Sequence, residues 1–343
     1  MRTRAIYGCA GQALGADERA FFADAQPWGF ILFGRNIADP DQVRALVNAL
    51  RESIGDASAP VLIDQEGGRV ARLKPPHWKA RAPAAAFGAL HNDAPETAHE
   101  AVYLQARLIA HDLCELGINV DCTPVLDLPV EGAHDVIGDR AFAHNATTII
   151  DLGRAVIEGM IEGGVLPVMK HIPGHGRATA DSHMALPRVS TPADELRATD
   201  FVPFRSLNHC PLAMTAHVVY EAIDPDHPAT TSARVIRGII RGELEFAGLL
   251  LSDDLSMQAL EGSLGARAHA AQFAGCDVVL HCNGGMEEMV DIAAEVKPLD
   301  DIHLKRAQSA LAHLSSPEPF DVEAGEARLA ELLGPNLPGI EVA

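Results

Sequence analysis

Short apolar runs alternate along the chain with longer amphipathic segments. Eight of the runs have the length of buried strands, about four to six residues. They lie at Arg4–Cys9, Gly29–Phe33, Pro60–Asp64, Asn119–Pro124, Leu166–His171, Leu212–His217, Gly248–Asp253 and Asp277–Cys282. Eight strands that alternate with helices are typical of a parallel α/β barrel, so we predict a single-domain (β/α)8 fold of the TIM type.

The segments between these runs have helical periodicity. The amphipathic patterns cover Asp41–Ile54, Glu96–Leu116, Thr147–Gly163, Asp194–Leu207, Ser232–Glu245 and Ser256–Ala274. The first connections are irregular, so the prediction allows for replaced or reversed strands at that end of the chain. An open, doubly wound sheet is the alternative architecture, and the strand count favours the barrel.

The chain has no Ser/Gly linker and no low-complexity block that would divide it. We therefore predict one catalytic barrel over residues 1–313. Residues 314–343 contain a Pro-rich stretch and a short helical pattern, and we interpret them as a C-terminal extension.

The charge balance limits the possible partners. The 343 residues contain 27 Lys and Arg against 47 Asp and Glu, a formal net charge of −20. Such a chain repels phosphate backbones and anionic membranes, so we expect neither nucleic acid nor a membrane as a partner. A 48% share of apolar residues excludes wholesale disorder.

The six cysteines include no Cys-x-x-Cys pair, and we expect them to be reduced core residues. No apolar run has the length of a signal peptide or of a membrane span. These features predict a cytoplasmic protein, and we expect a monomer.

Polar residues follow most of the predicted strands. Because the carboxyl ends of barrel strands share one rim, these side chains are expected to converge there. A strand-end aspartate can also cap the next helix, and one of Asp253 and Asp254 is expected to cap a helix that begins near Ser256. The strand-end residues are Asp64, Asp127, Lys170, His171, His217, Asp253, Asp254 and His281.

The connection after the fifth strand is unusually long and rich in titratable groups. More than twenty residues precede the next helix, and long ordered loops are commonly functional. Asp181 and His183 are two residues apart, a spacing that suits a carboxylate-oriented acid/base imidazole. A metal site formed by His171, His175, Asp181 and His183 is the competing interpretation, although the spacing matches no familiar template.

Three motifs together resemble one known family. They are Asp64-Gln-Glu-Gly-Gly-Arg69-Val-Ala-Arg72, Lys170-His-Ile-Pro-Gly-His-Gly with Asp181-Ser-His183, and Leu251-Ser-Asp253-Asp-Leu-Ser-Met257. In this order, and over about 200 residues, they resemble the family 3 glycoside hydrolases, specifically the NagZ-type β-N-acetylglucosaminidase branch.

The resemblance implies a role for each matching residue. Asp253 would be the catalytic nucleophile, and His183 the general acid/base with Asp181 as its partner. Arg72 and Lys170 also have a purely structural interpretation, as a solvated charge and as a partner of Asp64 or Asp127. The residues that would bind N-acetylglucosamine are Asp64, Arg72, Arg140, Lys170 and His171.

The resemblance also implies an activity. It predicts a retaining exo-β-N-acetylglucosaminidase that needs no cofactor or metal and acts on small-molecule cell-wall muropeptide fragments during peptidoglycan recycling. The alternatives are a phosphorylase on the same scaffold, a metal-dependent aldolase or hydrolase, and an amino-sugar-binding protein without turnover.

Overall fold

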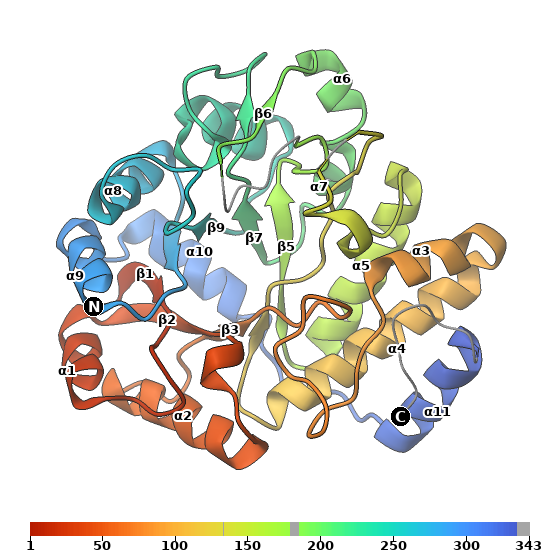
Figure 1. Ribbon diagram of the computed structural model, residues 1–343, viewed down its shortest axis with the longest axis horizontal. Coiled ribbons are helices and arrows are strands. Elements are labelled where there is room, and N and C mark those ends of the chain that lie inside the picture. The colour runs from red at the N-terminus through yellow and green to blue at the C-terminus, as the bar shows by residue number, and fades with distance from the viewer. Residues whose placement is uncertain (133, 179–184, 335–343) are drawn as a thin grey trace.

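The computed structural model describes residues 1–132, 134–178 and 185–334. Eight parallel strands close into a barrel in the order β1-β10-β9-β7-β5-β4-β3-β2, which Figure 1 shows surrounded by helices. The predicted barrel is therefore confirmed, and the open sheet is excluded. The barrel strands are β1 (Thr3–Tyr7), β2 (Pro27–Leu32), β3 (Val61–Ile63), β4 (Val120–Asp121), β5 (Leu166–Ile172), β7 (Leu212–Thr215), β9 (Leu249–Asp254) and β10 (Val278–His281).

All eight predicted runs overlap a barrel strand, including those at the irregular start of the chain. The first strands are neither replaced nor reversed, because β1 pairs in parallel with both β2 and β10. The irregularity is a register shift between Thr3 and Ile6 on the β2 side. A separate two-stranded sheet, β6 (Arg188–Val189) and β8 (Val219–Tyr220), stands outside the barrel.

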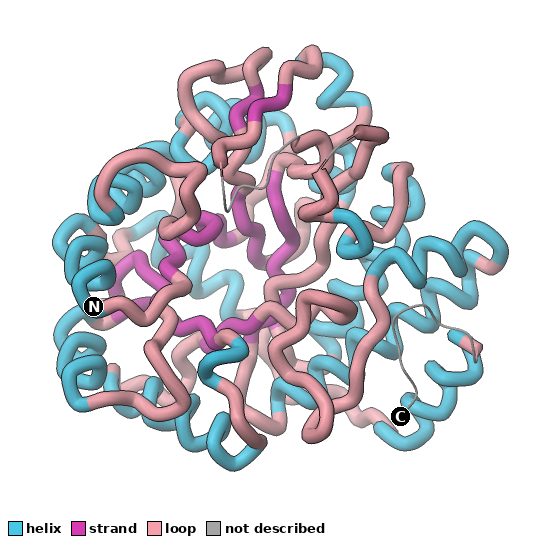
Figure 2. The backbone as a smooth tube through the Cα atoms, viewed as in Figure 1, coloured by secondary structure: helices cyan, strands magenta, loops and turns pink. Residues whose placement is uncertain are grey.

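Most of the α-helices form the outer layer around the strands, as Figure 2 shows. They are α1 (Ala16–Ala25), α2 (Pro40–Ser53), α3 (Ala84–Asp93), α4 (Pro95–Cys114), α5 (Ala146–Glu162), α6 (Ala193–Ala198), α7 (Val202–Ser206), α8 (Leu264–Ala274), α9 (Met286–Glu295), α10 (Asp301–Leu311) and α11 (Val322–Leu333). Short 3-10 helices lie at η1 (Gly34–Asn36), η2 (Gly138–Arg140) and η3 (Ala229–Thr231), and η4 (Arg234–Glu243) is a π-helix.

Two predicted helices differ from the observed ones. The segment predicted as one helix from Asp194 to Leu207 is split into α6 and α7, because Pro203 lacks the N–H that a continuous helix needs and lies instead in the first turn of α7. The helix predicted from Ser256 begins only at Leu264. Gly262 has a left-handed backbone with φ +87°, and Ser263 caps the helix by accepting from the Ala266 N–H.

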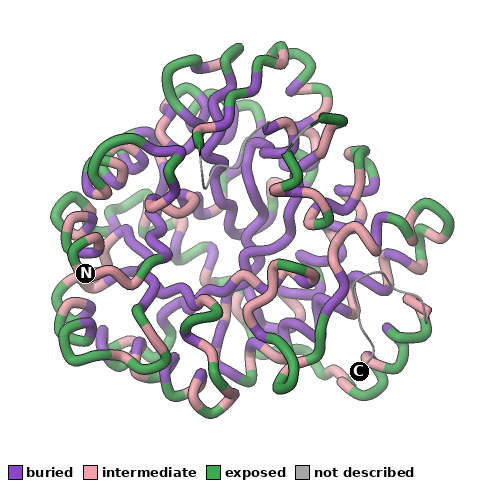
Figure 3. The backbone as a smooth tube through the Cα atoms, in the orientation of Figure 1, coloured by how far each residue is buried: buried purple, intermediate pink, exposed green. Residues whose placement is uncertain are grey.

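Strand pleating separates two layers of core. Along β9, Leu249 and Leu251 belong to the cluster that fills the barrel, whereas Leu250 belongs to the cluster between strands and helices. Buried backbone follows the strands in Figure 3, and exposed backbone lies on the outer turns. The same alternation decides which polar side chains at the strand ends face the barrel axis.

The N-terminal end of the barrel is closed by α10, whose Ala307 and Ala310 pack on the interior cluster. Asp277, which is fully buried just before β10, holds this helix. Its Oδ1 accepts from His303 Nδ1 at 2.7 Å and from Arg306 Nη1 at 2.8 Å. Its Oδ2 accepts from Arg241 Nη2 at 2.6 Å, so one carboxylate joins α10 to η4.

We expect Asp277→Asn to destabilise the fold. Burial opposes ionisation of Asp277, but the His303 hydrogen bond and the charges of Arg241 and Arg306 outweigh it and lower its pKa. Removing the charge leaves the partly buried Arg241 and Arg306 cations without their buried partner, which costs about 3 kcal/mol in the free energy of unfolding at pH 7. Because the pKa is lowered, the deficit should shrink as pH falls below about 4. Urea unfolding at pH 7 and below pH 4 measures this deficit.

Glu243→Gln is the control for this prediction. Its partner Arg197 and Glu243 itself have side chains that are 38% and 35% exposed, and exposed pairs contribute about 0–1 kcal/mol. Equal losses in the two variants would contradict a special role for Asp277.

The helix of the C-terminal extension, α11, packs on α4. Arg328 donates to both carboxylate oxygens of Glu100, at 2.8 and 2.9 Å. Glu326 accepts from Arg81 Nη1 at 3.0 Å, and so α11 also contacts the connection between β3 and α3. The domain division at residue 313 stays a prediction. Within the described ranges, no helix is long and apolar enough to cross a membrane.

Candidate active site

A pocket of about 170 Å³ opens at the carboxyl ends of the barrel strands. Its volume and its mixture of charged and apolar walls suit a small molecule. The charged or titratable side chains that line it are Asp64, Glu66, Arg72, Arg140, Lys170, His171, His175, Asp253 and Asp254, and the apolar ones include Phe33, Met214, Met257 and Leu280.

Strand alternation explains why three of these residues share the pocket. Lys170 is two residues beyond Val168, which faces the barrel interior, and Asp64 is two beyond the inward Leu62. Asp253 is likewise two beyond the inward Leu251. Each of these polar side chains therefore points to the same side of its strand as the apolar residue two positions earlier. The predicted convergence is confirmed for Asp64, Lys170 and Asp253.

Asp64 is held between two cations. Its Oδ1 accepts from Lys170 Nζ at 2.9 Å, and its Oδ2 accepts from Arg72 Nη2 at 2.9 Å. Burial opposes ionisation, but the Lys170 and Arg72 charges outweigh it and hold the Asp64 pKa well below its usual range. The Arg72 guanidinium also lies over the Phe33 ring, 5.1 Å from its centroid. Asp64 is therefore a charged acceptor at neutral pH.

Glu66 is the central acidic residue that sequence reasoning did not assign. Its Oε1 lies 2.7 Å from Lys170 Nζ, and its two oxygens accept from Arg140 Nη2 and Nε at 2.8 and 2.9 Å. The signal was its position two residues after Asp64, which directs both side chains to one face. Three cations against two carboxylates leave one positive charge in excess around Lys170.

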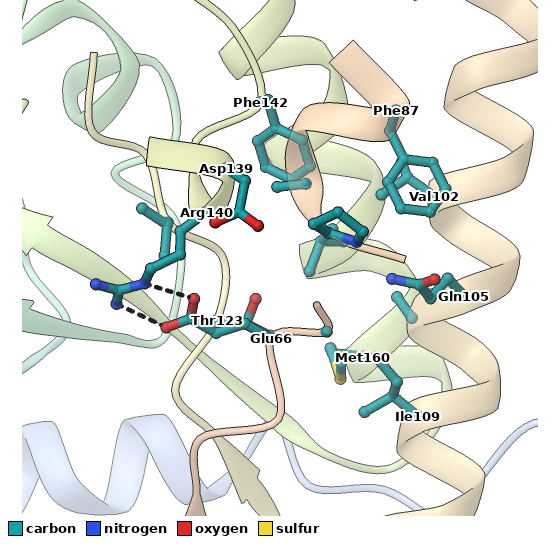
Figure 4. Close-up of a pocket in the computed structure, with 16 residues that line it drawn as sticks. Glu66, Phe87, Val102, Gln105, Ile109, Thr123, Asp139, Arg140, Phe142 and Met160 are labelled. Atoms are coloured by element: carbon teal, nitrogen blue, oxygen red, sulfur yellow. Dashed lines mark hydrogen bonds and ion pairs between the residues drawn. The ribbon is translucent and has the colours of Figure 1, made fainter. Parts of the chain in front are cut away.

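The Glu66–Arg140 pair separates the pocket from a second, inner cavity of about 30 Å³. In Figure 4 the dashed bidentate pair lies on one side of this space, and Phe87, Val102 and Phe142 are among the side chains that surround the rest. The inner cavity has room for about one water molecule. The fork of Arg140 is thus fixed at the back of the pocket by a buried partner.

Asp127 organises two histidines at the end of β5, His171 within the strand and His175 after it. It is fully buried, and it accepts from the backbone N–H groups of His171 and His175 at 3.2 and 2.7 Å. Its Oδ2 lies 2.7 Å from His171 Nδ1. With the Nδ1 proton donated to Asp127, a neutral His171 ring keeps Nε2 as an acceptor. Burial and the neighbouring His171 lower the pKa of His175 to about 4, so His175 is neutral at pH 7.

The two aspartates after β9 have different surroundings. Asp254 accepts from the N–H groups of Ser256 and Cys282, each at 3.1 Å, and from the Ser256 hydroxyl. It therefore caps the turn at Ser256, although no helix begins there. Asp253 lines the pocket, and its Oδ1 accepts the Asp254 N–H at 2.8 Å. Both aspartates line the pocket, and Asp254 is the one bonded to Ser256 and Cys282.

The predicted acid/base residues, Asp181 and His183, lie outside the described residues. The proposed metal ligands are affected too, since His171 and His175 are described and the other two are not. Among residues 1–132, 134–178 and 185–334, no group of three or more His, Cys, Asp or Glu side chains could hold a metal ion.

The predicted binding residues come together in this pocket: Asp64, Arg72, Arg140, Lys170 and His171. Together they can donate to several ligand oxygens and accept from hydroxyl groups, which is the chemistry of polyhydroxylated ligands. A carboxylate, Asp253, shares the pocket and can attack an electrophilic carbon held there.

A neighbouring buried carboxyl, Asp121, predicts a pH effect on stability. Its Oδ1 accepts the Gln65 N–H at 2.9 Å, and its Oδ2 has no hydrogen-bond partner among the described residues. Burial raises its pKa to about 7. The folded state then binds a proton more tightly than the unfolded chain, so this contribution is lost as pH rises from about 4 to about 7.

We expect the free energy of unfolding of the native protein, relative to Asp121→Asn, to fall by about 2–3 kcal/mol between pH 5 and pH 7. Asparagine is neutral throughout and removes only this titration, while the other carboxylates titrate equally in both proteins. Chemical unfolding at half-unit pH steps provides the curves. Parallel curves would show that Asp121 is already ionised at pH 5.

Comparison with known proteins decides the family. Residues 10–316 match the sequence model of the glycosyl hydrolase family 3 N-terminal domain. The chain belongs to glycosyl hydrolase family 3. A β-hexosaminidase of Alkalilimnicola ehrlichii is 37% identical over 333 residues, which cover 96% of this chain and 88% of the relative. One of Tolumonas auensis is 41% identical over 289 residues, 81% of each chain.

Solved family 3 structures confirm the fold. NagZ from Neisseria gonorrhoeae superposes with a TM-score of 0.86 at 30% identity, over 97% of this chain and 98% of that one. The same protein in complex with N-trifluoroacetyl-D-glucosamine superposes equally well. The resemblance found in the motifs therefore extends over almost the whole chain.

Proposed function

We propose that this family 3 enzyme is a retaining exo-β-N-acetylglucosaminidase that releases terminal N-acetylglucosamine from cell-wall muropeptide fragments in the cytoplasm. Family membership and β-hexosaminidase relatives at 37% and 41% identity place it among glycoside hydrolases that act as β-N-acetylhexosaminidases. The proposal adds the stereochemistry, the sugar, the aglycone and the residue roles.

The observation that carries the proposal is a pocket in which three cations and Asp64 lie together with the Asp253 carboxylate. Asp64 and the Lys170, Arg72 and Arg140 cations would bind the hydroxyl and acetamido oxygens of one sugar. This would present the anomeric carbon to Asp253. The pocket is small, which favours an exo-acting enzyme that binds a terminal unit. A NagZ solved with an N-acylated glucosamine supports the choice of sugar.

The proposed reaction proceeds by double displacement. Asp253 attacks the anomeric carbon, the bond to the aglycone oxygen breaks, and a glycosyl ester forms on the carboxylate. His183, oriented by Asp181, protonates the departing oxygen and then removes a proton from the attacking water. Water replaces the Asp253 oxygen at the anomeric carbon, and the β-configuration is retained.

The experiment that tests this function is proton NMR of a reaction with an aryl N-acetyl-β-glucosaminide, with and without phosphate. We expect hydrolysis without phosphate and β-N-acetylglucosamine as the first product. An α-product would contradict retention. A strict requirement for phosphate, with a sugar phosphate as product, would establish the phosphorylase. Binding without turnover under both conditions would identify a sugar-binding protein.

A further inference from the structure

A closed set of hydrogen bonds encircles the peptide groups next to Asp253. The Asp253 N–H lies 3.3 Å from the Thr215 hydroxyl, which lies 2.8 Å from the Thr230 hydroxyl. Thr230 Oγ1 lies 2.7 Å from His217 Nδ1, and His217 Nε2 lies 2.9 Å from the Asp254 carbonyl oxygen. The path thus returns to the chain one residue after it left.

For a neutral His217, the acceptor at the Asp254 carbonyl sets the direction of this ring. The Asp254 carbonyl only accepts, so His217 must carry a proton on Nε2. A neutral imidazole then accepts at Nδ1 from the Thr230 hydroxyl. Thr230 in turn accepts from the Thr215 hydroxyl, which accepts the Asp253 N–H. Each donor then has an acceptor within the ring, and the Thr230 hydroxyl also lies 3.1 Å from the Ala216 carbonyl oxygen.

The three side chains of the ring are removed from solvent. Thr215, His217 and Thr230 are each 0% exposed, and none of them lines the pocket. Thr230 comes from η3, which is held to the rim by the Ala229 N–H bond to the Val218 carbonyl at 2.8 Å. The ring therefore ties a separate segment of the chain to the end of β9.

We propose that Thr230 is a positioning residue for Asp253, acting through Thr215 on one peptide group and through His217 on the other. This rests on the proposed role of Asp253 as nucleophile. Hydrogen bonds hold both the Asp253 N–H and the Asp254 carbonyl. The backbone position of Asp253 is therefore fixed, and with it the distance from the carboxylate to the anomeric carbon. Thr230 contributes alignment and makes no contact with the sugar pocket.

Thr230→Val removes the hydroxyl and keeps the volume, while Thr230→Ser keeps the hydroxyl. We expect kcat of Thr230→Val on an aryl N-acetyl-β-glucosaminide to fall by about 10- to 100-fold, with KM within about twofold, because the binding side chains are untouched. Thr230→Ser should stay within about threefold of the native kcat. A native kcat in Thr230→Val, or an equal loss in Thr230→Ser, would overturn the proposal.

Thr148→Val is the matched control. Its hydroxyl is also buried and lies 3.3 Å from a histidine nitrogen, His91 Nδ1, but on the outer helix α5. Native kcat is expected there. Thr215→Val opens the same ring at the adjacent link, and it replaces Thr230→Val if that variant does not fold. The double variant should be no slower than the slower single one, since a ring is opened only once. Fully additive losses would contradict a shared ring.

A measurement without turnover separates this inference from the proposed function. Nitrogen-15 NMR of labelled histidines, assigned with His217→Gln, should show His217 protonated at Nε2 in the native protein, and the Nδ1 resonance should move in Thr230→Val. A proton on Nδ1 instead would overturn the ring. If the native enzyme hydrolyses no N-acetylglucosaminide, the proposed function is wrong, and the NMR result still tests the hydrogen-bond ring. If Asp253→Ala is inactive while Thr230→Val keeps full kcat, only the positioning role fails.

Discussion

Asp253→Ala will abolish turnover, by about 10⁴-fold or more in kcat, without unfolding the protein. In the proposed mechanism the carboxylate supplies the bond to the anomeric carbon, and no other described side chain at the end of β9 is expected to replace it. Asp254 is committed to Ser256 and Cys282 through both of its oxygens. Native thermal unfolding together with lost activity would assign the defect to chemistry.

Azide provides a sharper version of this test. Removing the Asp253 side chain opens space beside the anomeric carbon, and a small anion can attack there when the substrate has an activated leaving group. We expect Asp253→Ala with azide to give the α-glycosyl azide, by one inversion. A β-glycosyl azide, or native-like hydrolysis in the variant, would show that another group or the acetamido oxygen is the nucleophile.

His183→Ala should slow substrates according to their leaving group. General acid catalysis contributes about 10²–10⁴-fold where the departing oxygen needs a proton. We therefore expect a loss of that size in kcat/KM for a disaccharide with a sugar aglycone. An activated aryl glycoside, whose aryl group leaves as a stable anion, should lose far less of its rate at the first step. The comparison is made on both substrates with the same enzyme preparation.

His183→Gln serves as the second variant, since it keeps a polar side chain of similar length without an acid/base group in the neutral pH range. Equal losses on the two substrates in both variants would indicate that His183 only shapes the loop. Retention of a pH–rate profile with an unchanged alkaline limb would also count against its role as proton donor, because a donor must remain protonated as pH rises.

The barrel could be predicted from the sequence because buried parallel strands read as short continuous apolar runs. The ends of helices were harder, since Pro203 and Gly262 act through backbone geometry that periodicity does not report. The place of Asp64 and Lys170 in the pocket could be predicted because they lie within recognisable motifs at strand ends.

Glu66, Asp127 and Thr230 were not assigned because their roles arise only from contacts distant in sequence. Glu66 pairs with Arg140 across 74 positions, and no local pattern marks the two as partners. Thr230 lies in an ordinary turn sequence, Pro-Ala-Thr-Thr-Ser, which reads as a connection. Positioning residues of this kind become visible only when the barrel brings the segments together.

The closure of the barrel between β1 and β10 also has a consequence for synthesis of the chain. Tyr7 pairs in register with His281, and the side chain of Arg4 donates to the Asp277 carbonyl across 273 positions. At about 5–20 residues per second, a nascent β1 waits roughly 15–55 s for the strand that completes its ladder. During that time one apolar edge of the sheet is open, a state that invites aggregation. A ribosome stalled before residue 278 would hold a chain without β10, so the barrel could not close.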